Sequence, residues 1–292
     1  MNTIPIEKRV QILNLLVEGN SMRSIERIVG CSINTVTKLL CDVGAACAKY
    51  HDENVRGLQS KLVECDEIWS FCYAKQKNVA AAKAAPEGAG DVWTWTAIDA
   101  DSKLIISYLL GGRDAEYALE FTDDLRSRVD SRVQLTTDGY KVYLKAMEES
   151  FGDDVDYAQL VKMFGNAPGS TAGRYSPAEC TGIKKVCISG NPEYNKVSTS
   201  YVERQNLTMR MHMRRFTRLT NGFGKKLENQ LHAVSLHFMY YNFARIHKTL
   251  RVTPAMQAGL SDHVWSIEEI ARLAPELVAK KRGKYNKQKD RI

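Results

Sequence analysis

Three acidic residues, Asp66, Asp138 and Glu203, stand where a carboxylate could do chemistry. Asp66 lies within an apolar, strand-like stretch, where an ionised side chain is expensive unless a cation or hydrogen bonds compensate it. Asp138 ends another strand-like stretch, and Glu203 lies in a helical one. Acids from separate elements can converge and hold two divalent ions, Mg²⁺ or Mn²⁺, which offset the repulsion between carboxylates. Two such ions activate a water or a 3′-hydroxyl and stabilise the leaving oxygen of a phosphodiester.

Spacing alone does not single out these three acids. Glu67, Asp99 and Asp101 are alternatives in the same part of the chain, and each is also consistent with an ordinary turn or surface acid. From local chemistry the choice between the two sets stays open.

The segment Ser198–Leu219 combines a single acid, Glu203, with five arginines. It opens with Ser and Thr residues suited to a helix N-cap and contains no Gly or Pro, which predicts one helix throughout. Its apolar stripe at helical spacing comprises Val202, Met209, Met213 and Phe216. The planar guanidinium group suits phosphate oxygens, so we expect DNA phosphates to be bound by Arg204, Arg210, Arg214 and Arg215. A surface helix with solvated arginines is the alternative.

The first sixty residues show the spacing of a helix–turn–helix. Helices are expected over Pro5–Val17 and Met22–Val29, and a third from Ile33 continues toward Leu58 after a tight turn at Gly30. Such motifs place the start of the third helix against base edges in the major groove. We therefore expect DNA contacts from Asn34, Thr35, Thr37 and Lys38. A small helical bundle that packs against another part of the protein is the alternative.

The elements expected after Lys61 are three strands, a helix, a strand and a helix: Leu62–Tyr73, Asp91–Ala97, Lys103–Leu110, Asp114–Val129, Val133–Thr137 and Lys141–Glu149. This order indicates an α/β domain with one mixed sheet. Residues 165–195 are rich in Gly, Pro, Ser and Asn, and we expect an insertion with little regular structure. It is either a mobile segment that becomes ordered over DNA or a tolerated surface insertion. We expect a long core helix over Leu227–Ile246, a short helix over Ile267–Leu277 and a basic tail from Lys280 onward.

The composition, 44% apolar and 26% charged, is ordinary for a soluble globular protein. A net charge of +7 favours a polyanionic partner. Seven cysteines without a C-x-x-C motif favour free thiols in a reducing cytoplasm over disulfides or a zinc knuckle. The N-terminus has no apolar stretch, and no run approaches about eighteen apolar residues, so we expect neither a signal peptide nor a membrane span.

Four stretches of the chain resemble the DDE transposases of the insertion-sequence-one family: CDEIWSFCYAKQKN, LTTDGYKVY, STSYVERQNLTMRMHMRRFTRLTNGFGKK and YYNFARIHKTLRVTPAMQAG. The resemblance implies a ribonuclease H-like fold with an Asp–Asp–Glu metal site. Asp66 matches the acid of a D-E-x-W motif, Asp138 that of D-G-x, and Glu203 that of E-R-x-N-L-x-x-R. Two features depart from the family: the interval between Asp138 and Glu203 is longer, and the N-terminal zinc-binding cysteines of some relatives are missing.

These observations predict three regions: an all-α helix–turn–helix domain over 1–60, an α/β ribonuclease H-like catalytic domain over 61–260 with an insertion at about 165–195, and a short helix and basic tail over 261–292. The expected function is that of a cytoplasmic bacterial DNA transposase, working as a homo-oligomer on DNA. It would bind the terminal inverted repeats of its element and target DNA, and would cleave and transfer strands with two Mg²⁺ or Mn²⁺ ions. The alternatives are a DNA-binding regulator whose second domain is inactive and only dimerises, and a ribonuclease H-type nuclease without strand transfer.

Overall fold

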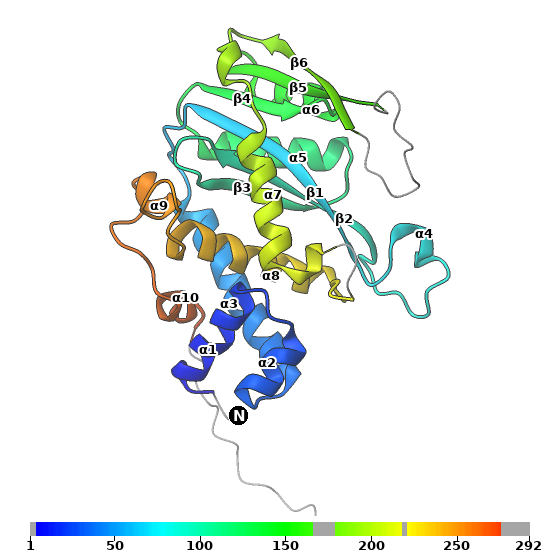
Figure 1. Cartoon of the computed structure of the whole chain (residues 1–292), viewed down its shortest axis with the longest axis vertical. Helices are drawn as coiled ribbons and strands as arrows, with labels where there is room; N and C mark the ends of the chain where they lie inside the picture. The colour runs from blue at the N-terminus through cyan, green and yellow to red at the C-terminus, as the bar shows by residue number, and fades with distance from the viewer. Residues whose placement is uncertain (1–3, 166–178, 218–220, 276–292) are drawn as a thin grey trace, which may run out of the picture.

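The computed structural model describes residues 4–165, 179–217 and 221–275. A mixed sheet with helices on both faces makes up one end of the molecule in Figure 1, and the N-terminal helices gather at the other.

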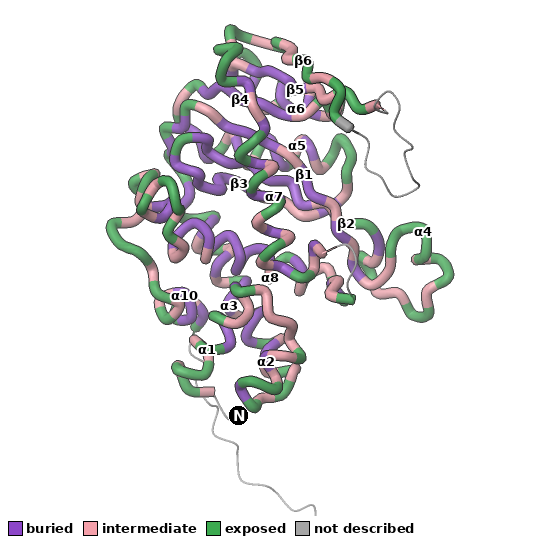
Figure 2. The backbone as a smooth tube through the Cα atoms, in the orientation of Figure 1, coloured by how far each residue is buried: buried purple, intermediate pink, exposed green. Residues whose placement is uncertain are grey.

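The sheet has six strands in the order β3-β2-β1-β4-β5-β6. They are β1 (Leu62–Cys72), β2 (Gly90–Asp99), β3 (Ile105–Gly111), β4 (Val133–Asp138), β5 (Val155–Gly165) and β6 (Glu179–Ser189). β1 pairs antiparallel with β2 and parallel with β4, and β5 pairs parallel with β4 and antiparallel with β6. The central strands are buried on both faces, as Figure 2 shows, which is why their sequences are apolar with little alternation.

Helices α5 (Ala115–Arg128) and α6 (Val142–Phe151) cover one face of the sheet, and α7 (Ser200–His212) and α8 (Leu227–Met239) cover the other. On the first face the Trp95 ring lies 5.9 Å from that of Phe121 and 5.4 Å from that of Tyr143. On the second, Ile68 belongs to an apolar cluster with Val202 and other side chains of α7 and α8. α8 continues into a π-helical turn at 240–244, so the long core helix predicted there is largely confirmed.

The N-terminal helices are α1 (Ile6–Val17), α2 (Met22–Val29) and α3 (Ile33–Asn54), close to the predicted ranges. Ser21 and Ser32 cap α2 and α3 by accepting backbone N–H groups, and Gly30 ends α2 in the left-handed region at φ +67°. In the described chain no single helix is long and apolar enough to cross a membrane; only α2 and α3 taken together, bent by 112°, reach that length and composition.

Helix α3 packs along α8 and ties the N-terminal helices to the sheet domain. Gly44 allows this close approach, because a Cβ there would lie only 2.5 Å from the Cβ of His232. Farther along α3, His51 contacts the Ile105 carbonyl through Nε2 at 3.2 Å. Asp52 accepts a hydrogen bond from Arg128 of α5 at 2.9 Å. A single apolar cluster accordingly contains residues from α1, α3, α5 and the sheet.

Three short helices complete the described chain: α4 (Gln76–Val79), α9 (Pro254–Gln257) and α10 (Ile267–Leu273). α10 starts with a capping box formed by Ser266 and Glu269 and ends four residues before the predicted limit. The predicted basic tail lies outside the described residues.

The prediction of an irregular insertion at 165–195 is wrong over its second half. Residues 179–189 form β6, which pairs along most of its length with β5, a strand that the sequence interpretation left unassigned. As an edge strand, β6 needs no apolar outer face, so Gly182 and two lysines hide its strand character in the sequence. Residues 166–178 lie outside the described residues.

The prediction of one helix over Ser198–Leu219 is also wrong. α7 ends at His212, Met213 is extended (φ −129°, ψ 105°), and residues 214–216 form a 3-10 turn. This break lets both Met213 and Phe216 enter the apolar cluster beneath α7 and α8. Residues 218–220 lie outside the described residues.

Candidate active site

Parallel pairing between β1 and β4 brings Asp66 and Asp138 together. The register places Leu62 opposite Gln134 and Glu64 opposite Thr136, and its continuation by two residues sets Asp66 opposite Asp138. The hydrogen-bonded ladder ends just before this point, at the carboxyl end of β4. One oxygen each from Asp66, Asp138 and the neighbouring Glu67 lie within 4.8 Å of one another. The sequence-predicted meeting of the first two acids is thus present in the structure.

Asp66 faces helix α7. Its Oδ2 accepts a hydrogen bond from Asn206 Nδ2 at 2.7 Å, and its Oδ1 accepts the Glu67 backbone N–H at 2.9 Å. Burial raises the pKa of the Asp66 carboxyl to about 7, and the negative charges of Glu67 and Asp138 act in the same direction. A cation beside Asp66 would offset both effects.

Glu67 points to the opposite face of the sheet, because successive residues of a strand alternate. Its side chain is only 1% exposed, forms an ion pair with Arg113, and accepts hydrogen bonds from Arg113 Nε at 2.6 Å and from Tyr143 Oη at 3.1 Å. Burial raises the pKa of the Glu67 carboxyl, Asp138 raises it further, and Arg113 opposes the shift. The surface-acid interpretation of Glu67 is therefore wrong.

The other two alternative acids behave as turn and surface residues. The Asp99 Oδ1 accepts the backbone N–H groups of Asp101 and Ser102 at 2.8 and 2.7 Å, which closes the turn between β2 and β3. Asp101 is exposed. Neither belongs to the carboxylate cluster found in the described residues.

Glu203 lies at the rim of the site, on α7, one helical turn before Asn206. Its side chain is 42% exposed, forms an ion pair with Lys162 of β5, and accepts a hydrogen bond from Thr199 Oγ1 at 2.6 Å. It stands outside the 4.8 Å cluster, yet its charge still contributes to the raised pKa of Asp66. The structure thus places Glu203 on the helix that contacts Asp66 and pairs it with a lysine.

Glu64 positions α7 over the site, a role that the sequence interpretation missed. Its Oε2 accepts the backbone N–H groups of Tyr201 and Val202 at 2.7 and 3.0 Å. These are free donors of the first helical turn, where a negative charge also complements the helix dipole. The predicted capping by the preceding Ser and Thr residues is found in part: Ser198 Oγ accepts the Ser200 backbone N–H at 3.1 Å, whereas Thr199 makes no side-chain cap. Two-residue alternation along ECDE places Glu64 and Asp66 on one face and could have revealed this pair.

The donor set fits a hard divalent cation. Asp66 and Asp138 offer carboxylate oxygens, the ligands that Mg²⁺ and Mn²⁺ prefer. In the described residues no lysine or arginine forms an ion pair with either of them. Glu67 is already neutralised by Arg113. Asp66 and Asp138 would therefore hold the ion, with Glu203 available once Lys162 releases it.

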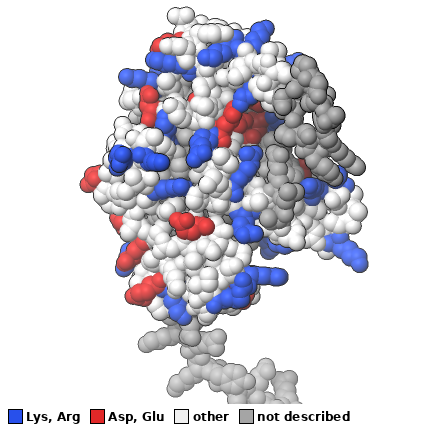
Figure 3. Space-filling view, in the orientation of Figure 1, with Lys and Arg blue, Asp and Glu red and all other residues white. Residues whose placement is uncertain are grey.

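The predicted phosphate-binding arginines differ in exposure and line different parts of the surface: Arg204 lies beside Lys103 and His247, and Arg214 and Arg215 line a cavity next to the N-terminal helices. Arg204 and Arg214 are exposed, whereas Arg210 and Arg215 are partly buried. Only the first two in sequence, Arg204 and Arg210, lie on α7; the other two lie on the 3-10 turn after it. In Figure 3 lysine and arginine side chains border the acidic side chains in front of the sheet.

The predicted base-contacting residues all lie in the first half of α3. Asn34 and Lys38 are exposed, and Lys38 forms an ion pair with Asp42 at 2.7 Å. Thr35 hydrogen-bonds to Ser32 within the N-cap at 3.1 Å. Thr37 donates to the Ile33 carbonyl at 2.9 Å. Asn34 and Lys38 are thus accessible from solvent, while the two threonines have partners within the helix and its cap.

Known proteins provide the following comparisons. No family model matches the chain, and no curated protein is similar to it in sequence. Among solved structures it is similar to a pre-cleavage Mos1 transpososome (12% identity, TM-score 0.23, covering 54% of this chain and 60% of that one). It is also similar to a piggyBac transposase synaptic complex with hairpin DNA (10% identity, TM-score 0.37, covering 74% of this chain and 52% of that one). A third similar structure is a Mos1 mariner paired-end complex with Mn (10% identity, TM-score 0.28, covering 82% of this chain and 77% of that one). The chain spans about three fifths of the first neighbour and half of the second.

Proposed function

We propose that this protein is a DNA transposase of the insertion-sequence-one type, with Asp66, Asp138 and Glu203 as its catalytic acids. One observation supports this most directly: Asp66 and Asp138 meet at the ends of adjoining parallel strands, beside the helix that presents Glu203. A partly buried pair of acids that has no cationic partner among the described residues has little value for stability. It is the arrangement needed to bind a divalent cation.

Each residue has a distinct part in this proposal. Asp66 and Asp138 would hold the ions, and Asn206 positions the Asp66 carboxylate through its hydrogen bond. Glu203 would complete the metal site when Lys162 gives up its ion pair, and that lysine would then be available to a phosphate. When bound, two Mg²⁺ or Mn²⁺ ions supply activation of a water or 3′-hydroxyl and stabilisation of the leaving oxygen.

The remaining parts of the chain serve DNA binding. Arg204, Arg210, Arg214 and Arg215 hold DNA phosphates, while Asn34, Thr35, Thr37 and Lys38 read the terminal inverted repeats. Base-edge contacts supply sequence preference, and phosphate contacts supply most of the affinity. The protein would act in the cytoplasm as a homo-oligomer that brings element ends and target DNA together.

The test compares strand nicking with DNA binding. Asp66→Asn, Asp138→Asn and Glu203→Gln are each incubated with Mg²⁺ or Mn²⁺ and labelled duplexes from the DNA that flanks the gene. Asp101→Asn is the matched control, because Asp101 is an exposed acid outside the cluster. We expect all three site variants to bind DNA in a gel-shift assay but to lose nicking, and the control to keep both.

Full nicking by any one of the variants would remove that residue from the site. If the wild-type protein binds the duplex but never nicks it with either metal, a DNA-binding regulator with an inactive second domain becomes the better assignment. Nicking without joining of the freed 3′-end to a target plasmid would favour a nuclease.

A further inference from the structure

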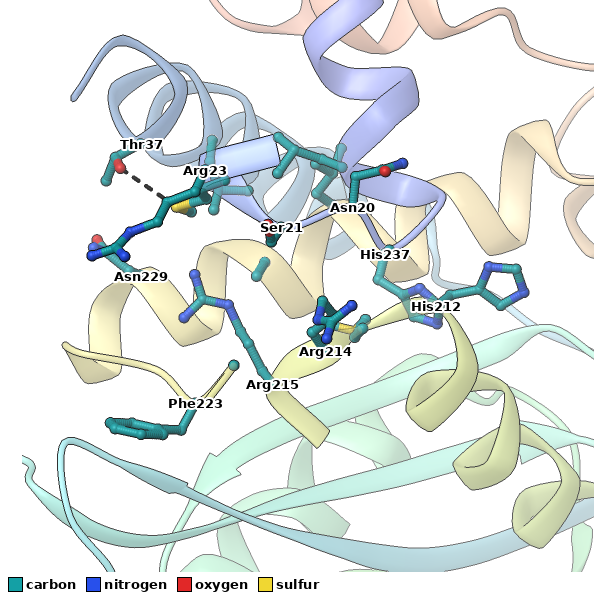
Figure 4. A pocket seen from close by; sticks show the side chains of 18 of the residues that line it. Asn20, Ser21, Arg23, Thr37, His212, Arg214, Arg215, Phe223, Asn229 and His237 are labelled. Atoms are coloured by element: carbon teal, nitrogen blue, oxygen red, sulfur yellow. Dashed lines mark hydrogen bonds between the residues drawn. The ribbon is translucent and has the colours of Figure 1, made fainter. Parts of the chain in front are cut away.

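A second feature, separate from the carboxylate site, is a cavity of about 400 Å³ between the N-terminal helices and the end of α7. Figure 4 shows it bounded by the α1–α2 turn, the start of α3, the 3-10 turn after α7, and α8. Its volume lies within the range of about 300–1,000 Å³ typical of small-molecule sites.

The charged side chains on the wall of this cavity are all basic. Arg23, Arg214, Arg215 and Lys225 line it, and none of its described lining residues is acidic. None of these four cations takes part in an ion pair within the described residues. Arg215 reaches into the cavity in Figure 4, and burial lowers the pKa of its guanidinium. A partly buried arginine without a carboxylate partner calls for an anion.

A buried histidine on the same wall also lacks a partner. His237 is 3% exposed, and neither of its ring nitrogens has a hydrogen-bond partner among the described residues. Burial lowers the pKa of its imidazole to about 3, so the ring is neutral and offers one donor and one acceptor. The neighbouring His212 ring, in contrast, is engaged by Arg245 at 2.8 Å. His237 is therefore available to a polar group of a ligand in the cavity.

The rest of the lining is apolar and amide-bearing. Leu16, Met22, Leu40 and Leu236 supply hydrocarbon surface, and Asn20 and Asn229 supply amide groups. Inorganic phosphate would satisfy the arginines but leave this surface and His237 without contacts. An organic phosphate with a partly apolar, hydrogen-bonding body would contact the arginines, the apolar side chains and the amide and imidazole groups of the lining.

We propose that this cavity binds a nucleoside phosphate, with Arg214 and Arg215 on the phosphate and His237 on a polar group of the nucleoside. The nucleotide is either free or part of a DNA strand. The site lies apart from the carboxylate cluster and does not depend on whether the protein cuts DNA.

The test measures equilibrium binding to the full-length protein by calorimetry, with deoxyadenosine monophosphate and a single-stranded trinucleotide as separate titrants. Arg214→Gln and Arg215→Gln remove one guanidinium each. Arg214 is exposed, so its variant should fold even if the partly buried Arg215 variant does not. Arg272→Gln, an exposed arginine on α10 that does not line the cavity, is the control. Circular dichroism of each variant reports folding.

We expect the wild-type protein and the control to bind at least one titrant equally, and each folded cavity variant to bind it about tenfold more weakly, the loss of one charge-assisted hydrogen bond. Weaker binding of the monophosphate assigns a free nucleotide; weaker binding of the trinucleotide alone assigns a nucleotide within a strand. The proposal is overturned if the wild type binds neither, or if Arg214→Gln binds both as well as the wild type. Nucleotide binding by Asp66→Asn separates the two proposals, because Asp66 belongs to the carboxylate cluster and does not line the cavity.

Discussion

Replacing Arg113 by Met tests the assignment of Glu67 as a structural acid held by an ion pair. The Glu67 side chain is 1% exposed and meets Arg113 at 2.5 Å, so the substitution leaves a buried carboxylate with Tyr143 as its remaining described partner. Breaking a buried pair from one side costs about 3–5 kcal/mol. Arg113 is itself 35% exposed, so water can reach the gap and the lower end of that range applies. Met retains part of the hydrophobic contact that the arginine stem makes.

A comparison with Glu67→Gln separates the energy of the Arg113–Glu67 ion pair from the contributions of the two single side chains. The glutamine would keep the size of the side chain, and Arg113 could turn toward solvent, so we expect a loss of about 1 kcal/mol. The double variant should lose less than the sum of the two single losses, by about 2 kcal/mol, because no buried charge is then left unpaired. Urea unfolding of the four proteins at pH 8 measures these values.

The penalty in Arg113→Met also depends on pH, with a definite sign. Burial already raises the Glu67 pKa in the folded protein, and loss of Arg113 raises it further. A folded-state pKa above the unfolded value means that stability is lost as pH rises through that interval. The penalty should therefore be larger at pH 8 than at pH 5. A loss below about 1 kcal/mol at pH 8, or equal losses at both pH values, would refute the buried-pair reasoning. Full loss of nicking in Glu67→Gln would instead make Glu67 a catalytic acid.

Three further outcomes are expected. Gly44→Val should lower the free energy of unfolding, measured in urea, by at least about 2 kcal/mol, because the valine side chain would collide with α8. The control Ala45→Val, at an exposed position, should change it by less than about 1 kcal/mol, and equal effects would refute the close-packing argument. Burial lowers the pKa of His51 to about 4, so between pH 6.5 and 4 the unfolded chain binds a proton at this ring that the folded chain does not. The free energy of unfolding should therefore fall by about 3 kcal/mol as the pH is lowered across that window, and His51→Gln should flatten this pH dependence. Lys38→Gln should weaken binding to the terminal repeats by about 1–3 kcal/mol and relax the sequence preference in a gel-shift assay, and unchanged affinity and preference would place Lys38 outside the base-edge contacts.

Local sequence determined much of the element order. The periodic apolar stripes of α1, α5 and α8 and the capping residues Ser21, Ser32 and Asp114 act within a few residues of themselves, so their structures could be predicted closely. The strands β1 to β4 were recognisable for the same reason. β6 was not, since an edge strand takes its regularity from the partner β5 and not from its own alternation.

The residues of the candidate site likewise include some that the sequence identifies and some that only the tertiary structure identifies. Acids within or at the end of an apolar strand stand out in the sequence, and Asp66 and Asp138 were identified from it. Which further acid joins them depends on how β1, β4 and α7 pack together and on which acids pair with a lysine or an arginine from distant parts of the chain. Lys162 reaches Glu203, and Arg113 reaches Glu67, across separations that no local pattern encodes. Tertiary packing decided these pairings, because the interaction of two charges depends on their distance and burial and not on their separation in sequence.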